Sequence, residues 1–185
     1  AAVLRCSALS GGGIYLNNAS AVLQGAAVVA NCSASAHGGG FSVWRVSSVA
    51  VRENATVASC KAGQRGGGVY AADSGSSVRL HSSHGLDVAG RTGAVANCSA
   101  DEDGGGLFLE SAARLEMGLH GAVADCVATR GGGVYLERGS LAIFAGSARV
   151  TRNSATGGDG GAVLASNSGV VLRDAASITL NRARR

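Results

Sequence analysis

The segment Gly66-Gly67-Gly68-Val69-Tyr70-Ala71 belongs to a pattern that recurs along the whole 185-residue chain. Its glycine triplet has five relatives, of which the last is degenerate: Gly11–Gly13, Gly38–Gly40, Gly104–Gly106, Gly131–Gly133 and Asp159–Gly161. The third residues of successive copies are 27, 28, 38, 27 and 28 positions apart. A nearly fixed period of this length is the signature of a solenoid, in which each repeat forms one coil and stacks on the next.

Each triplet is followed by three residues whose first and third members are apolar, as in Val69-Tyr70-Ala71 and Leu107-Phe108-Leu109. This alternation is typical of a strand with one buried face. Two further short alternating runs follow in each repeat, such as Val78-Arg79-Leu80 and Ala94-Val95-Ala96. Three short strands and three turns per repeat describe one coil of a parallel β-helix.

We therefore predict an all-β fold, a right-handed parallel β-helix solenoid with 27–28 residues and three short strands per coil. The chain accommodates five full coils plus partial coils at both ends. We expect a single domain over residues 1–185 that is a fragment of a larger protein, with an insertion loop at about residues 81–92. A helical solenoid is the alternative, but a glycine triplet in every repeat argues against helices.

The composition excludes several classes of protein. Glycine, alanine and serine number 30, 34 and 22, whereas aromatic residues make up 4% and proline is absent. The absence of proline excludes collagen, and an apolar content of 46% is too high for a disordered linker. The net charge of +4 includes three arginines within residues 182–185, so the rest of the chain lacks the basic face of a nucleic-acid binder. No uninterrupted apolar run approaches the ~18 residues of a membrane span.

The five cysteines occupy equivalent places, seven or eight residues before the third glycine of the next triplet: Cys6, Cys32, Cys60, Cys98 and Cys126. Stacked coils would set these thiols in one column. A disulfide framework or a metal site is one interpretation, and a structural ladder of small side chains is the other. We favour the ladder because adjacent coils are ~4.8 Å apart, whereas disulfides prefer Cβ atoms about 3.8 Å apart. No cofactor is predicted.

Asparagine often precedes the thiol position, which predicts a second structural ladder of Asn31, Asn97, Asn153 and Asn181. In this alignment Ser154 and Arg182 take the place of cysteine in the last two coils. Asn-x-Ser/Thr sequons begin at Asn18, Asn31, Asn54 and Asn97. We expect the ladder residues Asn31 and Asn97 to be inaccessible, which leaves Asn18 and Asn54 as the glycan sites.

The middle residue of the first strand should face outward, and this position is aromatic in four coils: Tyr15, Tyr70, Phe108 and Tyr135. Ser42 and Val163 take the same place in the other two coils. Such an exposed stripe would bind a partner protein or stack on sugar rings, or it would stabilise the sheet by cross-strand pairing. The insertion adds His81, His84 and Asp87, either as a protruding loop or as part of a binding face.

Catalytic chemistry has weak support in the sequence. The acidic run Asp101-Glu102-Asp103 is a weak candidate for a calcium site, and its nearest acidic partner at a matching turn, Asp159, lies two coils away. The spacing of His81 and His84 suits a metal, but a fourth ligand is not evident. We predict no catalytic residues and no enzyme, with a polysaccharide lyase or glycoside hydrolase as the alternative.

The repeat resembles that of the chlamydial polymorphic outer-membrane proteins, which carry a Gly-Gly-aliphatic and a Phe-x-x-Asn motif in each coil. All six glycine corners match the first motif. The second is present with an aliphatic residue in place of phenylalanine in Val28–Asn31, Val150–Asn153 and Ile178–Asn181. The resemblance implies an exposed, adhesin-like β-helix at the cell surface or outside the cell. Its partners would be another protein or glycan at a surface, or neighbouring domains of the same chain; pectate-lyase-like enzymes are the rival comparison.

Overall fold

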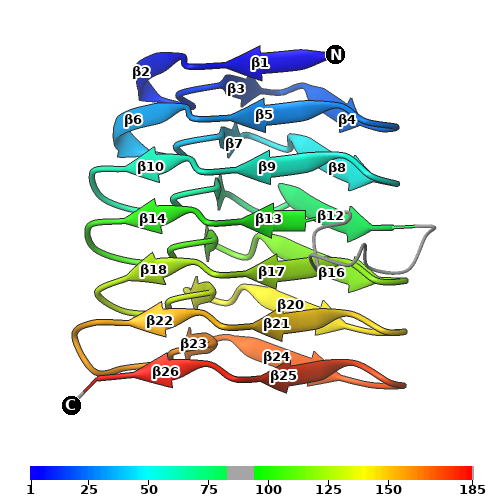
Figure 1. Cartoon of the computed structure of the whole chain (residues 1–185), viewed down its shortest axis with the longest axis vertical. Coiled ribbons are helices and arrows are strands. Elements are labelled where there is room, and N and C mark those ends of the chain that lie inside the picture. Colours follow the sequence, from blue (N-terminus) through cyan, green and yellow to red (C-terminus); the bar gives the residue numbers. More distant parts are fainter. Residues whose placement is uncertain (83–93, 185) are drawn as a thin grey trace.

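The computed structural model in Figure 1 describes residues 1–82 and 94–184 and shows a parallel β-solenoid. Every regular element of the described residues is a strand, and all paired strands run parallel. No helix among these residues is long and apolar enough to cross a membrane. The predicted fold class is therefore confirmed. The insertion predicted for about residues 81–92 lies almost entirely outside the described part of the chain.

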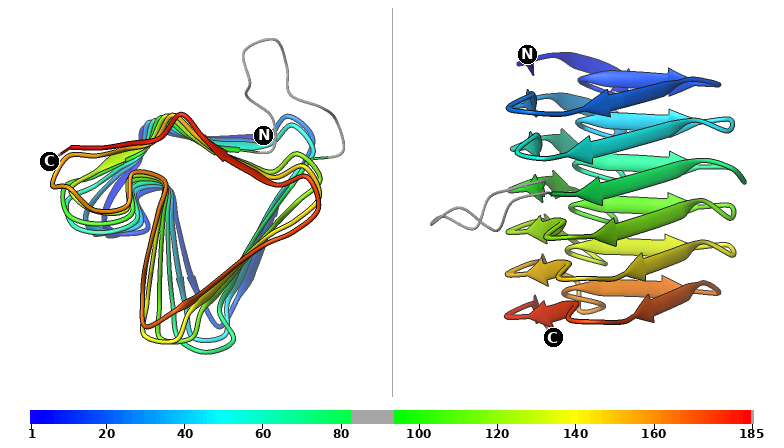
Figure 2. Two further views of the ribbon diagram at one scale, coloured as in Figure 1. Left: turned by 90° about the horizontal axis from the view of Figure 1, so that it is seen from below. Right: turned by 90° about the vertical axis from the view of Figure 1, so that its right-hand side faces the viewer.

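The coils contain four strands rather than the three that we predicted, so four sheets run along the stack (Figure 2). Sheet A consists of β1 (Ala2–Leu4), β5 (Val28–Ala30), β9 (Thr56–Ala58), β13 (Ala94–Ala96), β17 (Ala122–Ala124), β21 (Arg149–Thr151) and β25 (Ser177–Thr179). Sheet B consists of β2 (Ser7–Ser10), β6 (Ser33–His37), β10 (Lys61–Ala62), β14 (Ser99–Ala100), β18 (Val127–Ala128), β22 (Ser154–Ala155) and β26 (Arg182–Ala183).

The other two sheets follow the glycine corner. Sheet C consists of β3 (Ile14–Asn17), β7 (Phe41–Trp44), β11 (Val69–Ala72), β15 (Leu107–Glu110), β19 (Val134–Glu137) and β23 (Val163–Ser166). Sheet D consists of β4 (Ser20–Leu23), β8 (Ser48–Arg52), β12 (Ser77–His81), β16 (Arg114–Gly118), β20 (Leu141–Phe144) and β24 (Gly169–Leu172). The sequence pattern does not reveal the strand that each coil contributes to sheet B. Several of these strands have only two residues and resemble part of a turn in the sequence.

The glycine triplets form the corner between sheets B and C. Each position of the triplet requires glycine for a different steric or conformational reason. Gly66 has a φ of +66°, a conformation that glycine adopts without steric cost. A Cβ atom on Gly67 would lie 2.3 Å from the carbonyl oxygen of Ser99 in the next coil. A Cβ atom on Gly68 would lie 2.5 Å from Cγ1 of Val95. The corner is therefore closed against any side chain by the backbone and core of the neighbouring coil.

The inner faces of the sheets enclose one continuous core. The inward residues of sheet A, for example Val57, Val95 and Val123, are fully buried, as are those of sheet D such as Leu80 and Leu115. No coil buries these side chains alone; each is covered by the coils above and below. The alternation predicted for the first strand is confirmed on this inner side.

The register of the last two coils differs from our alignment by one residue. Gly131 donates its N–H to the carbonyl of Asp159, and the positive φ falls on Gly160, so the sixth corner is Gly160-Gly161-Ala162. Leu164, and not Val163, is paired with Tyr135. The shift matters because it moves Asp159 into the column of residues that precedes the glycine corner.

Candidate functional site

The predicted exposed aromatic stripe is instead a buried column on the outer side of sheet C. Phe108 is 0% exposed, Tyr70 1% and Tyr135 5%, and only Tyr15, at 51%, is exposed as expected. The rings of Tyr70, Phe108 and Tyr135, which we call the aromatic column, stack with centroids 5.7 Å and 5.1 Å apart. Ser42 is also buried, and it accepts a hydrogen bond from Nε1 of Trp44 at 2.7 Å. The stripe is therefore a second core rather than a free surface.

Residues at the end of sheet B cover this column. His37 stacks on Tyr70 with ring centroids 4.6 Å apart, and the guanidinium groups of Arg65 and Arg130 lie 5.0 Å and 5.5 Å from the ring centroids of Phe108 and Tyr135. Seen along the stack, the chain bends inward at the glycine corner between sheets B and C (Figure 2), and side chains of both sheets pack in this inward bend. The covering residues are paired as parallel bridges along the stack and form what we call the corner column: His37, Arg65, Asp103 and Arg130.

Asp103 is the electrostatic centre of the corner column. Its carboxylate is 1% exposed and accepts hydrogen bonds from Nε and NH2 of Arg130 at 2.8 and 2.9 Å, with Nε of Arg65 3.7 Å away. This bidentate pair raises the pKa of Arg130. A buried carboxylate between two guanidinium groups holds adjacent coils together and keeps the arginines over the aromatic rings.

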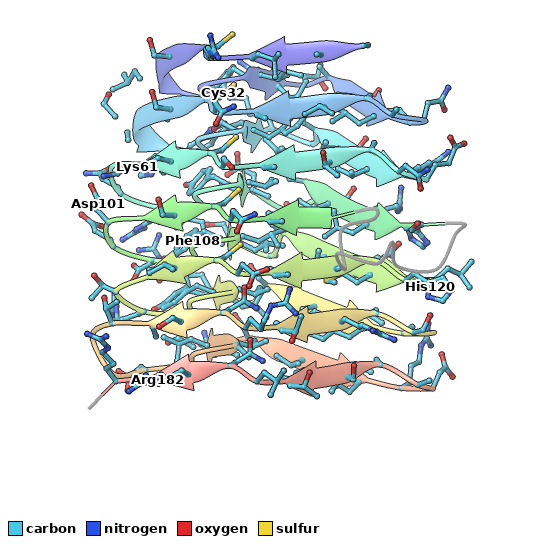
Figure 3. All side chains as sticks on the ribbon, in the orientation of Figure 1. Cys32, Lys61, Asp101, Phe108, His120 and Arg182 are labelled. Carbon is cyan, nitrogen blue, oxygen red and sulfur yellow. The ribbon has the colours of Figure 1, made fainter. Side chains whose placement is uncertain are left out.

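The acidic run that we considered for calcium is divided among different partners. Asp101 pairs with Lys61 at 3.0 Å on the outer edge of sheet B, where Figure 3 shows both side chains, and Glu102 lies 3.9 Å from Arg65. Asp103 points inward to Arg130. No group of three metal-ligating side chains occurs among residues 1–82 and 94–184. Each of the three carboxylates therefore lies beside a cationic side chain of this chain.

A pair of carboxylates, Glu110 and Glu137, lies at the ends of β15 and β19 in sheet C. Glu110 accepts a hydrogen bond from the Tyr70 hydroxyl and another from NH1 of Arg138 at 2.7 Å. Arg65 and Arg138 lie 3.7 and 3.6 Å from Oε1 of Glu137. Burial, followed by the neighbouring carboxyl group of Glu110, raises the pKa of Glu137, and this outweighs the nearby arginines. Burial also raises the pKa of Tyr70 and lowers that of His37.

The raised pKa of Glu137 predicts a specific pH dependence. Because the folded state holds this proton more tightly than the unfolded chain, the ionised side chain destabilises the fold at neutral pH, and this cost disappears below the ordinary value of 4.5. We expect Glu137→Gln to raise the thermal midpoint at about pH 7 and to match the parent chain at about pH 4. Thermal unfolding followed by circular dichroism measures both.

Glu116→Gln is the control for this prediction, because the Glu116 side chain is 40% exposed and pairs with Arg79 at 2.9 Å. Loss of this ion pair should lower the free energy of unfolding by no more than about 1 kcal/mol. The substitution should not stabilise the chain at any pH. A Glu137→Gln chain that is less stable than the parent at about pH 7 would show that attraction to Arg65 and Arg138 outweighs burial.

The cysteines form a column inside the corner between sheets A and B (Figure 3). All five thiols are free; Cys6 is partly exposed, and the other four are buried. Each buried Sγ donates to the carbonyl two residues earlier, at 3.2 to 3.3 Å, and lies 3.8 to 3.9 Å from a valine carbonyl of the coil before. Hydrogen bonds along the column and burial raise the pKa values of Cys60 and Cys98.

This environment predicts that the buried thiols react slowly, since the thiolate is the reactive form. We expect an alkylating reagent at about pH 8 to label only Cys6 in the folded chain and all five cysteines in denaturant. Intact mass and peptide mapping identify the labelled residues. Rapid labelling of Cys60 or Cys98 in the folded chain would contradict the buried column.

The predicted asparagine ladder is correct for two residues and wrong for the other two. Asn153 and Asn181 occupy the cysteine column, not Ser154 and Arg182. Oδ1 of Asn153 accepts from the N–H of Cys126 at 2.9 Å, and its Nδ2 donates to the carbonyl of Val123 and to Oδ1 of Asn181, each at 3.0 Å. Asn31 and Asn97 instead point outward, so the expectation that they are inaccessible is wrong.

The histidines of the insertion are only partly described. His81 belongs to β12 and not to a loop, and it is paired with Gly118 and Arg52 on the neighbouring strands. Burial lowers its pKa. A shallow hollow beside it is lined by Arg52, Glu53, Ser82 and Leu119. His84 and Asp87 lie outside the described residues.

The sequence analysis did not identify the charged residues around the aromatic column, notably Arg65, Arg130, Glu110 and Glu137. A signal was present: the residue before each glycine corner after the first is histidine or charged, with alternating charge from Arg65 onward. The corrected register extends this series to Asp159, whereas Ser10 precedes the first corner. Its meaning depends on sheet B, which brings that position over the aromatic column. Comparison of the chain with protein-family models, curated proteins and solved structures found no match.

Proposed function

We propose that this chain is a non-catalytic structural or adhesive module of a secreted or cell-surface protein. One observation carries the proposal. Of the eleven acidic residues in the described part of the chain, ten bind a cation or a backbone N–H of another coil: Glu53, Asp73, Asp101, Glu102, Asp103, Glu110, Glu116, Asp125, Glu137 and Asp174. Carboxylates that hold coils together through these contacts are not free to act on a substrate.

Stacked coils suit this role because the strands of each coil pair with those of its neighbours, so the sheets form a stiff scaffold on which outer residues are displayed at fixed spacing. The sequence resemblance to the chlamydial polymorphic outer-membrane proteins supports the surface location through the glycine corners. The Asn motif supports it less, because Asn31 faces outward whereas Asn153 and Asn181 lie inside the stack. Surface exposure of the parent protein is thus an inference from the repeat and its sequons.

A second candidate function is a carbohydrate-active solenoid, and the observation that favours it is the carboxylate pair. A glutamate whose pKa is raised by burial beside one that accepts hydrogen bonds from Tyr70 and Arg138 resembles the acid and base arrangement used in glycoside hydrolysis. Against this candidate, both glutamates are largely buried beside the aromatic column, so a sugar must displace the side chains that pack there.

A single experiment separates the two functions. The folded chain is incubated with neutral and acidic polysaccharides, with and without calcium, and new reducing or unsaturated ends are measured. The matched control is the double variant Glu110→Gln, Glu137→Gln. We expect the parent chain and the variant to give the same background. Turnover by the parent chain that the double variant loses would overturn the structural proposal and support the enzyme.

A further inference from the structure

The asparagines with exposed side chains include those of all four Asn-x-Ser/Thr sequons, together with Asn17 and Asn167, which are not followed by serine or threonine at the required position. The side chains of Asn18, Asn31, Asn54 and Asn97 are all exposed, and none of them makes a hydrogen bond to another described residue. The two asparagines that form the inner ladder, Asn153 and Asn181, are not followed by serine or threonine at the required position. Sequons and structural asparagines are therefore separate sets in this chain.

The backbone alone does not account for asparagine at positions 31 and 97. Both residues lie at the corner between sheets A and B with a φ near +50°, a conformation that asparagine tolerates well. The same corner in the other coils is built with Arg5, Ser59, Asp125, Arg152 and Leu180, all at positive φ. Since arginine, serine and leucine also fit, the conformation leaves the choice of asparagine unexplained.

From this geometry we infer that Asn31, Asn97, Asn18 and Asn54 are acceptors of asparagine-linked oligosaccharide. The inference rests on the proposed secreted or surface location, because the transfer takes place in the secretory route. In the transfer, Nδ2 of asparagine forms a bond to the anomeric carbon of a lipid-pyrophosphate-linked oligosaccharide. The glycosyl–phosphate bond breaks, the lipid pyrophosphate leaves with the electron pair, and the amide loses one proton.

The stack accommodates these glycans without a change of fold. Asn31 and Asn97 point away from the core, while the intervening cysteines of their sequons, Cys32 and Cys98, point into it. The two asparagines are two coils apart in one column, about 10 Å at the spacing of parallel strands. Asn18 lies at the corner between sheets C and D, and Asn54 between sheets D and A. The glycans would thus occupy three corners and leave the glycine corner uncovered.

The test is expression of the chain behind a secretion leader in a eukaryotic host. Peptide mass spectrometry follows release by an amidase that converts each glycosylated asparagine to aspartate. We expect conversion at Asn31 and Asn97 as well as at Asn18 and Asn54, and loss of one glycan in each of Asn31→Gln, Asn97→Gln and Ser99→Ala. If the host retains the chain, the same peptides are read from its membrane fraction.

A matched gain-of-site variant uses the coil between Asn31 and Asn97. The pair Ser59→Asn, Lys61→Ser places a sequon at the same corner with the same buried cysteine between its members. We expect one additional glycan and unchanged circular dichroism. A folded chain whose Asn31 and Asn97 are unmodified would overturn the inference and leave the structural role intact. Polysaccharide turnover lost in the Glu110→Gln, Glu137→Gln variant would overturn the structural role and leave occupancy of the sequons intact.

Discussion

Replacing Gly67 by alanine is expected to lower the free energy of unfolding by about 3 kcal/mol or more, the upper end for an overpacked site. The new Cβ atom would lie 2.3 Å from the carbonyl oxygen of Ser99 and 2.4 Å from that of Gly105. Both obstacles are backbone atoms of the next coil, so no side chain can rotate to make room. Urea unfolding followed by circular dichroism measures the loss.

Gly139→Ala is the matched control for Gly67→Ala. Gly139 has a φ of +79°, but no atom lies within 4 Å of its added Cβ. Alanine there meets only the cost of a left-handed backbone, about 1 to 2 kcal/mol. If Gly67→Ala were no more destabilising than Gly139→Ala, coils would not approach each other as closely at the glycine corner as the structure indicates.

Phe108→Ala should cost about 3 to 5 kcal/mol, the usual range for a large buried aromatic side chain. Phe108 lies between Tyr70 and Tyr135 under the guanidinium of Arg65, so alanine removes both stacking partners and the cation–π contact. Thermal and urea unfolding measure the effect.

Tyr15→Ala tests the equivalent position of sheet C on β3, where the aromatic side chain is not buried. Because Tyr15 is half exposed, its removal is expected to cost less than about 1 kcal/mol. Equal losses from Tyr15→Ala and Phe108→Ala would show that sheet B does not cover the aromatic column, as our sequence-based expectation of an exposed stripe had implied.

The sequence predicted the solenoid well because its main determinants are local. Gly66–Gly68 and the alternation Val69-Tyr70-Ala71 define a corner and a strand within six residues, and the repeat carries them through the chain. Alternation also assigned Tyr70 to the outer side of sheet C correctly. It did not reveal that His37 and Arg65 would cover that side, because this depends on how far the short sheet B bulges beyond the corner.

The assignment of Ser154 and Arg182 to the cysteine column was wrong for a different reason. In the linear sequence Asn153-Ser154 resembles Asn31-Cys32, so aligning the repeats by their asparagines is the natural choice. In the folded chain Asn153 lies inside, where an amide is acceptable only because Cys126 N–H and the Val123 carbonyl are both in reach. Those partners belong to the preceding coil. A one-residue shift between coils is therefore visible only once the stack is assembled.

The column that precedes the glycine corners also bears on how such a protein changes length. Asp103 and Arg130 occupy the same place in successive coils, 27 residues apart, and each coil hydrogen-bonds only to its neighbours. Because the charges of this column alternate from Arg65 to Asp159, a duplication or deletion of two successive repeats adds or removes two whole coils and keeps opposite charges adjacent. Unequal recombination within the gene can then change the length of the stack in steps of about 10 Å, two coil spacings, without a new interface.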